Sequence, residues 1–153
     1  MTGRPARMQR RAGSVAAPVL FPPARVAALL FILVAACAPA TTDNADAERA
    51  FAEHQSNIEV TARGTVTRVL GDESGPSGTH QRFVIRLVGS AQTVLIDNNV
   101  TIGTRVPAAL DDEVVAHGEY VWNDQGGLIH FTHHDPARTH DDGWIELRGV
   151  RYS

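Results

Sequence analysis

The sequence predicts an all-β fold: a small five- to six-stranded Greek-key barrel similar to the OB-fold, preceded by a short N-terminal helix. Three observations favour this fold. Apolar and polar residues alternate with a period of two in successive segments after residue 57. Short clusters of Gly, Asn, Asp, Ser and Pro separate these segments. Their order, a long first strand, a hairpin, a long connection and a final hairpin, matches the order of that small barrel.

The first predicted elements are a helix and a long strand. The helix is expected over residues 46–56, where Asp46 can cap it and the apolar residues share one face. The strand follows from Ile58 to Val69 and opens the barrel domain, which we expect to occupy residues 57–153. Gly64 within this strand predicts a β-bulge or a sharp bend.

A hairpin and a long connection come next. Residues 71–79 are rich in Gly, Ser and Pro and predict a loop. Strands are expected at residues 82–88 and 92–97, joined by a short turn. Residues 98–109 show no helical period, so the sequence predicts a connection without a helix.

The last elements form a second hairpin and a tail. The fourth strand follows Asp111 and places alternate apolar residues on one face up to Trp122. Residues 123–126 are typical of a hairpin turn, and the fifth strand is expected from Leu128 to about His133. The tail, residues 143–153, predicts a sixth strand or a small hairpin covering the barrel.

Charge divides the chain into two parts. All 14 basic residues are Arg, five of them precede residue 37, and all 17 acidic residues follow it. The part from residue 37 onward therefore carries nine Arg against 17 acids, a net charge of -8. Such a charge repels polyanions and disfavours nucleic acid as a partner. The absence of Lys excludes a phosphate-loop lysine and a Schiff-base lysine.

The basic first part precedes an uncharged apolar run from Val26 to Ala36. This run is too short to span a bilayer, which needs about 20 residues. A basic segment, a short apolar run and small residues at the cleavage point are typical of a secretory signal. We expect residues 1–36 to be a lipoprotein signal peptide and residues 37–45 to be a flexible tether.

The lipoprotein assignment depends on Leu33-Val34-Ala35-Ala36-Cys37, which resembles the lipobox of bacterial lipoproteins. The resemblance implies cleavage before Cys37, a diacylglycerol on its thiol and an acylated N-terminus. Ala38 resembles the residue found in lipoproteins sorted to the outer membrane. The protein would then be lipid-anchored in the bacterial envelope and face the periplasm, with the membrane as a partner. The alternative is cleavage after Ala40, which would release a soluble periplasmic protein.

A dense group of histidines near the end of the fifth strand suggests a site. The candidate metal ligands are His130, His133, His134, Asp135 and His140. Zn²⁺ is the favoured ion, because neutral imidazole is its common ligand. In a regular strand His130 and His134 would stand about 13 Å apart. A single site therefore requires the strand to end near Thr132, and Pro136 favours such an ending.

The same residues also have a structural interpretation. The pattern sets Glu119 opposite His130 as a cross-strand ion pair. His133 would then lie at the strand end, and Asp135 would form an Asx-type turn before proline. A second candidate site is His80 with Arg82, which could bind a carboxylate or phosphate. The histidines could also respond to pH or take part in catalytic acid–base chemistry, but these patterns identify no individual catalytic residue.

One long motif and several shorter ones carry a family resemblance. They are His80–Phe83, Gly118–Tyr120, Asn123–Pro136, His140 and Gly143–Ile145. With these motifs the chain from Gly64 to Tyr152 resembles a bacterial family of small exported proteins described as a domain of unknown function. The resemblance implies a small secreted or envelope β-domain and no assigned activity.

Two classes of function remain open. The favoured hypothesis is a non-enzymatic module that binds an envelope protein, a glycan, a small ligand or a metal. The alternative is a metal-dependent hydrolase, such as a nuclease or phosphodiesterase, that uses the segment from His130 to His140.

Overall fold

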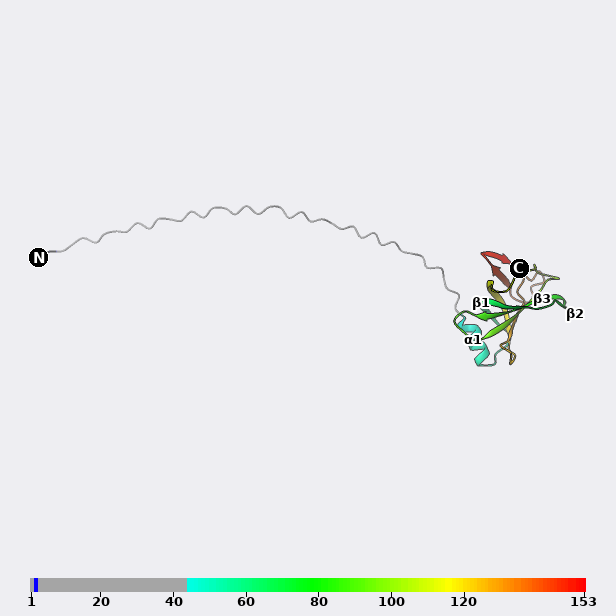
Figure 1. The fold of residues 1–153 in the computed structure, drawn as a ribbon, viewed down its shortest axis with the longest axis horizontal. Helices are drawn as coiled ribbons and strands as arrows, with labels where there is room; N and C mark the ends of the chain where they lie inside the picture. Colours follow the sequence, from blue (N-terminus) through cyan, green and yellow to red (C-terminus); the bar gives the residue numbers. More distant parts are fainter. Residues whose placement is uncertain (1, 3–43) are drawn as a thin grey trace, which may run out of the picture. The chain divides into compact units, whose positions relative to one another are not determined.

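The computed structural model describes residue 2 and residues 44–153. Cys37 and, apart from residue 2, the predicted signal peptide lie outside the described residues. The elements are α1 (Ala45–Ala52), β1 (Ile58–Val69), β2 (Glu73–Gly75), β3 (Gly78–Leu87), β4 (Thr93–Asn99), β5 (Glu113–Val121), β6 (Leu128–His130), β7 (Trp144–Leu147) and β8 (Val150–Tyr152). The predicted fold class is confirmed: a small all-β barrel preceded by a short helix (Figure 1).

The barrel closes through five strands in the order β1-β3-β4-β6-β5, with β5 returning to β1. Strand β1 has a neighbour on each of its edges: its first part pairs with β5 and its second part pairs with β3. The pairing of β4 with β6 is parallel and joins Leu95 to Leu128 and Ile96 to Ile129. The other pairings around the barrel are antiparallel, so this short parallel seam joins the two halves of the Greek key.

Two hairpins extend beyond the barrel. The tail forms a small hairpin of β7 and β8, and β7 pairs with β5. The predicted loop at residues 71–79 is instead a β2–β3 hairpin with a tight turn between Gly75 and Gly78. A loop was expected because the segment is rich in Gly, Ser and Pro, but Pro76 and Ser77 form a turn that lets β2 pair with β3.

Gly64 lies where β1 is paired on both sides, with Leu87 of β3 and with Val114 of β5. A Cβ at this position would lie 2.6 Å from the carbonyl oxygen of Arg86, so only glycine allows the strands to approach. The register shift falls between Val66 and Arg68, after the glycine. The bulge is therefore displaced from its predicted position.

The core follows the predicted alternation. On β3 the side chains of Phe83, Ile85 and Leu87 are buried, and on β5 every second residue from Val114 to Tyr120 is buried. Tyr120 is fully buried, and its hydroxyl donates a hydrogen bond to the Gly126 carbonyl oxygen at 2.9 Å. Burial raises the pKa of Tyr120 to about 12, because the phenolate would lose its hydration.

Helix α1 is anchored on the barrel by the residue that precedes it. Asn44, not Asp46, occupies the N-cap position. The Asn44 side-chain amide donates to the carbonyl oxygens of Arg63 and Val88, and its oxygen accepts the Arg63 N–H at 2.7 Å. Figure 1 shows α1 beside the barrel. Ala47 and Ala50 of this helix belong to the buried core. In the described part of the chain, no helix has the length and apolar character needed to cross a membrane.

The connection between β4 and β5 contains no helix, as predicted, and a buried amide ties it to the barrel. Gln81 donates to the Val106 carbonyl oxygen at 2.6 Å and accepts the Val106 N–H at 2.9 Å. Asn98 donates to Gln81 and to the Thr104 carbonyl oxygen, and it accepts a hydrogen bond from the Thr132 hydroxyl. This network links the connection to the start of the loop after β6.

Candidate functional site

A cleft of about 540 Å³ opens where β3, β4 and β6 meet the loop of residues 131–140. Its volume falls within the range of about 300–1,000 Å³ typical of small-molecule sites. Four imidazoles line it, and they come from two distant parts of the chain: His80 from β3, and His130, His133 and His140 from β6 and the loop. We call this the histidine-lined cleft.

The loop reaches the cleft because β6 ends abruptly. Phe131 adopts a positive φ of 52°, which turns the chain out of the sheet. Two glycines make room for this turn, because a Cβ at Gly118 would overlap the His130 carbonyl oxygen and one at Gly143 would overlap the Phe131 carbonyl oxygen. The strand was expected to continue to about His133, and this left-handed residue ends it earlier.

The rings at the turn stack on one another. Phe131 lies between His130 and His140, with ring centroids 3.9 Å and 4.0 Å away. The imidazole of His130 also meets Glu119 at 3.0 Å, and the two residues are directly opposite in the β5–β6 register. The predicted cross-strand pair is confirmed, and it fixes the His130 ring at the edge of the cleft.

Asp135 organises the loop. Its carboxylate accepts the N–H groups of Ala137, Thr139 and His140 and the Thr139 hydroxyl. Burial alone would raise the pKa of Asp135, but these hydrogen bonds outweigh it and hold the pKa well below its usual range. The predicted Asx-type turn is confirmed by the bond from Ala137, and both carboxylate oxygens are already occupied by loop donors.

His133 and His140 make an edge-to-face ring contact in the cleft. Their ring centroids are 5.1 Å apart and the rings are nearly perpendicular. Nδ1 of His133 lies 2.9 Å from the His134 carbonyl oxygen, and Nδ1 of His140 lies 2.7 Å from that of Asp141. A carbonyl oxygen only accepts, so each Nδ1 carries the proton. In the neutral rings the lone pair therefore lies on Nε2, and the Nε2 of His140 is 3.8 Å from an Asp135 carboxylate oxygen.

His134 lies outside the cleft. Its side chain is 64% exposed, and its Nδ1 lies 2.9 Å from an Asp142 carboxylate oxygen. The same oxygen accepts the Asp135 N–H, and this bond, together with the one from His134, lowers the pKa of Asp142. Among the residues that the structure describes, no three His, Cys, Asp or Glu side chains converge into a group that could hold a metal ion.

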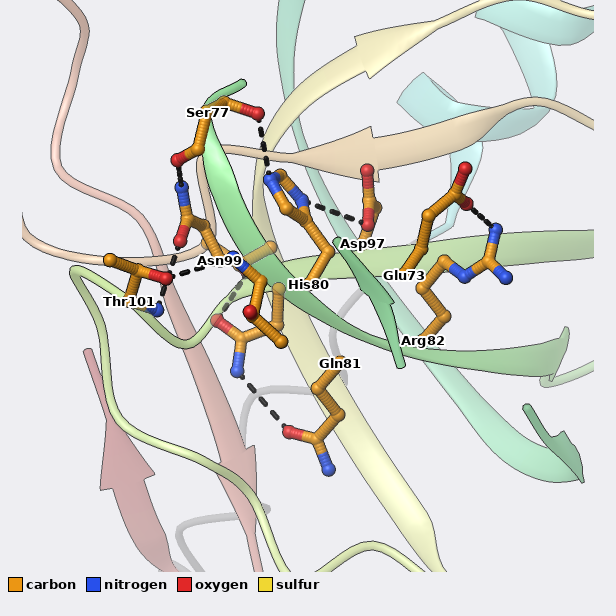
Figure 2. Close-up of polar contacts among 11 residues, drawn as sticks. Glu73, Ser77, His80, Gln81, Arg82, Asp97, Asn99 and Thr101 are labelled. Atoms are coloured by element: carbon orange, nitrogen blue, oxygen red, sulfur yellow. Dashed lines mark hydrogen bonds and ion pairs between the residues drawn. The ribbon is translucent and has the colours of Figure 1, made fainter. Parts of the chain in front are cut away.

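His80 and Arg82, which the sequence grouped, lie on the same face of β3 but have different ion-pair partners. Arg82 forms an ion pair with Glu73 of β2, whereas His80 contacts Asp97 of β4 (Figure 2). His80 also lines the histidine-lined cleft. Between them, the Gln81 side chain turns inward to the buried network. Alternation along β3 explains the inward turn of Gln81, because Gln81 lies on the opposite face from His80 and Arg82.

Two residues at the cleft were not singled out by the sequence. Ser77 Oγ lies 3.0 Å from His80 Nε2, and Asp97 Oδ1 lies 3.1 Å from His80 Nδ1 (Figure 2). The Asp97 contact is a diagonal pair, since the β3–β4 register sets Arg82 opposite Asp97 and His80 opposite Asn99. The alternation in the predicted strand at residues 92–97 could have suggested Asp97. The exposed β2 strand of the hairpin that carries Ser77 shows no apolar alternation, so the sequence predicted only a loop there.

The fold and this site define a class: a small OB-like barrel with a cleft lined by imidazoles at one end of its parallel seam. The chain belongs to the family described as "Protein of unknown function (DUF3465)", whose family model matches residues 29–153. No curated protein and no solved structure matches the chain.

Proposed function

We propose that the protein is a lipid-anchored module of the bacterial envelope that binds a small ligand in its histidine-lined cleft. The observation that carries the binding proposal is the gathering of four imidazoles around one cleft of suitable volume. The wall also includes Phe131, Ile102 and Ala137, so apolar contacts surround a few polar groups. This composition is typical of small-molecule sites.

Zn²⁺ is the ligand that the chemistry of the cleft favours first. The neighbouring rings of His133 and His140 are each held through Nδ1 by a backbone carbonyl, which leaves the lone pair on Nε2. Metal-bound histidines are commonly oriented in this way. His133 and His140 would bind the ion, with water in the remaining positions. Asp135 would act by holding the loop, since its oxygens are already occupied.

Zinc binding has a direct test with matched histidine variants. The purified full chain is expected to bind one Zn²⁺ in calorimetry and to melt at a higher temperature with zinc, because a ligand of the folded state stabilises it. His133→Ala/His140→Ala should abolish both effects. His134→Ala, at an exposed histidine outside the cleft, should retain them. No zinc-dependent rise in melting temperature in the unchanged chain, or an equal rise in the double variant, would refute zinc as the ligand.

The lipid anchor is supported by the order of sequence features before the barrel. Basic residues, the apolar run from Val26 to Ala36 and the sole cysteine follow one another as in a lipoprotein precursor. With two or three acyl chains the attachment would be firm, whereas one chain holds a protein only marginally. Ala38 supports the outer membrane as the destination.

Processing in cells tests the anchor. Cys37→Ala is expected to leave the precursor uncut and without incorporated palmitate, whereas Thr41→Ala, a nearby control, should mature normally. An inhibitor of the lipoprotein signal peptidase should have the same effect as the cysteine change. Normal maturation of Cys37→Ala would show that the chain is cleaved as an ordinary secretory precursor.

A further inference from the structure

Ser77, His80 and Asp97 form a hydrogen-bonded chain at the edge of the histidine-lined cleft, and we call these three the serine group. Figure 2 shows the imidazole of His80 between the other two side chains. Oδ1 of Asp97 lies 3.1 Å from Nδ1, and Oγ of Ser77 lies 3.0 Å from Nε2. An ionised carboxylate only accepts, so Nδ1 carries the proton and Nε2 accepts the Ser77 hydroxyl proton.

This order of contacts is the one that activates a serine nucleophile. The imidazole can take the hydroxyl proton as the oxygen attacks, and the carboxylate fixes the ring orientation and stabilises the imidazolium. The relation is recognised by geometry and not by sequence order. A histidine that is merely solvated would lack either the hydroxyl at Nε2 or the carboxylate at Nδ1, whereas His80 has both.

The serine is held in place although it lies in a hairpin turn. Asn99 of β4 donates to the Ser77 carbonyl oxygen at 2.8 Å. The Thr101 hydroxyl accepts the Thr79 N–H at 2.8 Å and packs against Gly78, where φ is 122° and a Cβ would lie 2.6 Å from that hydroxyl oxygen. The turn is therefore tied to the end of β4 by Asn99 and to the connection after β4 by Thr101, which limits the positions open to the Ser77 hydroxyl.

The hydroxyl is also accessible. Ser77 is exposed, and His80 and Asp97 retain 19% and 24% exposure of their side chains. The serine group lines the cleft of about 540 Å³ and also a neighbouring hollow of about 230 Å³. An ester has an acyl part and an alcohol part, and two hollows that share these residues can receive one each. Ile102 and Phe131 in the larger one favour an apolar acyl group.

We propose that the serine group is a hydrolytic site for carboxylic esters with small apolar acyl groups. Ser77 Oγ bonds to the carbonyl carbon while its proton moves to His80 Nε2. The bond from that carbon to the alcohol oxygen then breaks, and the alcohol leaves with the proton from His80. Water, deprotonated by His80, attacks the acyl-serine, releases the carboxylic acid and restores Ser77. This activity goes beyond the binding function proposed above and uses neither His133 nor His140.

Covalent labelling tests the nucleophile. The full chain is treated with an alkyl fluorophosphonate, and the modified residue is located by peptide mass spectrometry. Labelling at Ser77 is expected, with loss in Ser77→Ala and a fall of about 100-fold in rate in His80→Gln, the size of a lost general base. Ser74→Ala is the matched control, because Ser74 lies in the same hairpin but contacts only Thr79 through its hydroxyl.

Hydrolysis of p-nitrophenyl butyrate supplies the second readout. Turnover should vanish in Ser77→Ala and persist in Ser74→Ala, whereas both variants should keep the zinc-dependent rise in melting temperature, so that failure of zinc binding and failure of this site are distinguishable. Circular dichroism of each variant confirms folding. Absence of label at Ser77 in the folded unchanged chain, or labelling and turnover that survive His80→Gln, would overturn the proposal.

Discussion

Gly118→Ala is expected to destabilise the barrel by about 3 kcal/mol or more, at the upper end of the cost of overpacking. Gly118 lies in β5, where a Cβ would overlap the His130 carbonyl oxygen and approach the Ile129 side chain. The carbonyl belongs to the backbone at the end of β6 and cannot rotate away. The strand pair must separate locally, which also displaces the Phe131 turn and the rings stacked on it.

Chemical denaturation followed by circular dichroism measures this loss. Gly71→Ala is the control, because a Cβ at Gly71 meets nothing within 4 Å. It should unfold at the denaturant concentration of the unchanged chain. Equal stability of Gly118→Ala and Gly71→Ala would mean that the approach of β5 to the end of β6 is looser than described.

Gln81→Leu has the second large effect, an expected loss of about 2–6 kcal/mol. The substitution keeps the volume roughly constant but leaves the N–H and the carbonyl oxygen of Val106 without their partner. Val106 is 1% exposed, so water cannot replace the amide, and each buried group left unsatisfied costs about 1–3 kcal/mol. Asn98 also loses an acceptor.

Thermal melting and hydrogen exchange together check this result. Beyond a lower melting temperature, we expect faster amide exchange in residues 100–109, the connection that Gln81 holds. Gln125→Leu, at an exposed position of the β5–β6 turn, should change neither quantity. A Gln81→Leu protein with unaltered exchange in the connection would show that other contacts hold it.

Period and turn chemistry were enough to predict the barrel. The alternation in β1, β3 and β5 directly encodes which face is buried, and the order of hairpins implies the closure. The same reasoning predicted the Glu119–His130 pair, because the length of a hairpin turn determines which residues of its two strands lie opposite each other. The β2–β3 hairpin was not predicted because β2 is fully exposed. An exposed strand needs no apolar face, so its sequence shows no alternation.

The candidate site was predictable only in part. The histidine segment was visible in the sequence, but the left-handed conformation of Phe131 decides which rings enter the cleft. This conformation could not be predicted, because the residue at the turn is not a glycine. This turn leaves His134 exposed while His133 is 2% exposed. The partnership of His80 with Ser77 and Asp97 depends on a strand register and a tight turn, neither of which composition determines.

The parallel seam between β4 and β6 has a consequence for how the chain folds. Leu95 and Ile96 of β4 can pair only after Leu128 and Ile129 of β6 have been synthesised, and the barrel cannot close before this pairing forms. Pairings between residues distant in sequence slow folding, because the entropy of loop closure is lost before the contacts form. A chain that emerges N-terminus first therefore stays an open sheet until nearly all of it is available. The cleft at the end of the seam comes into existence only at that last step.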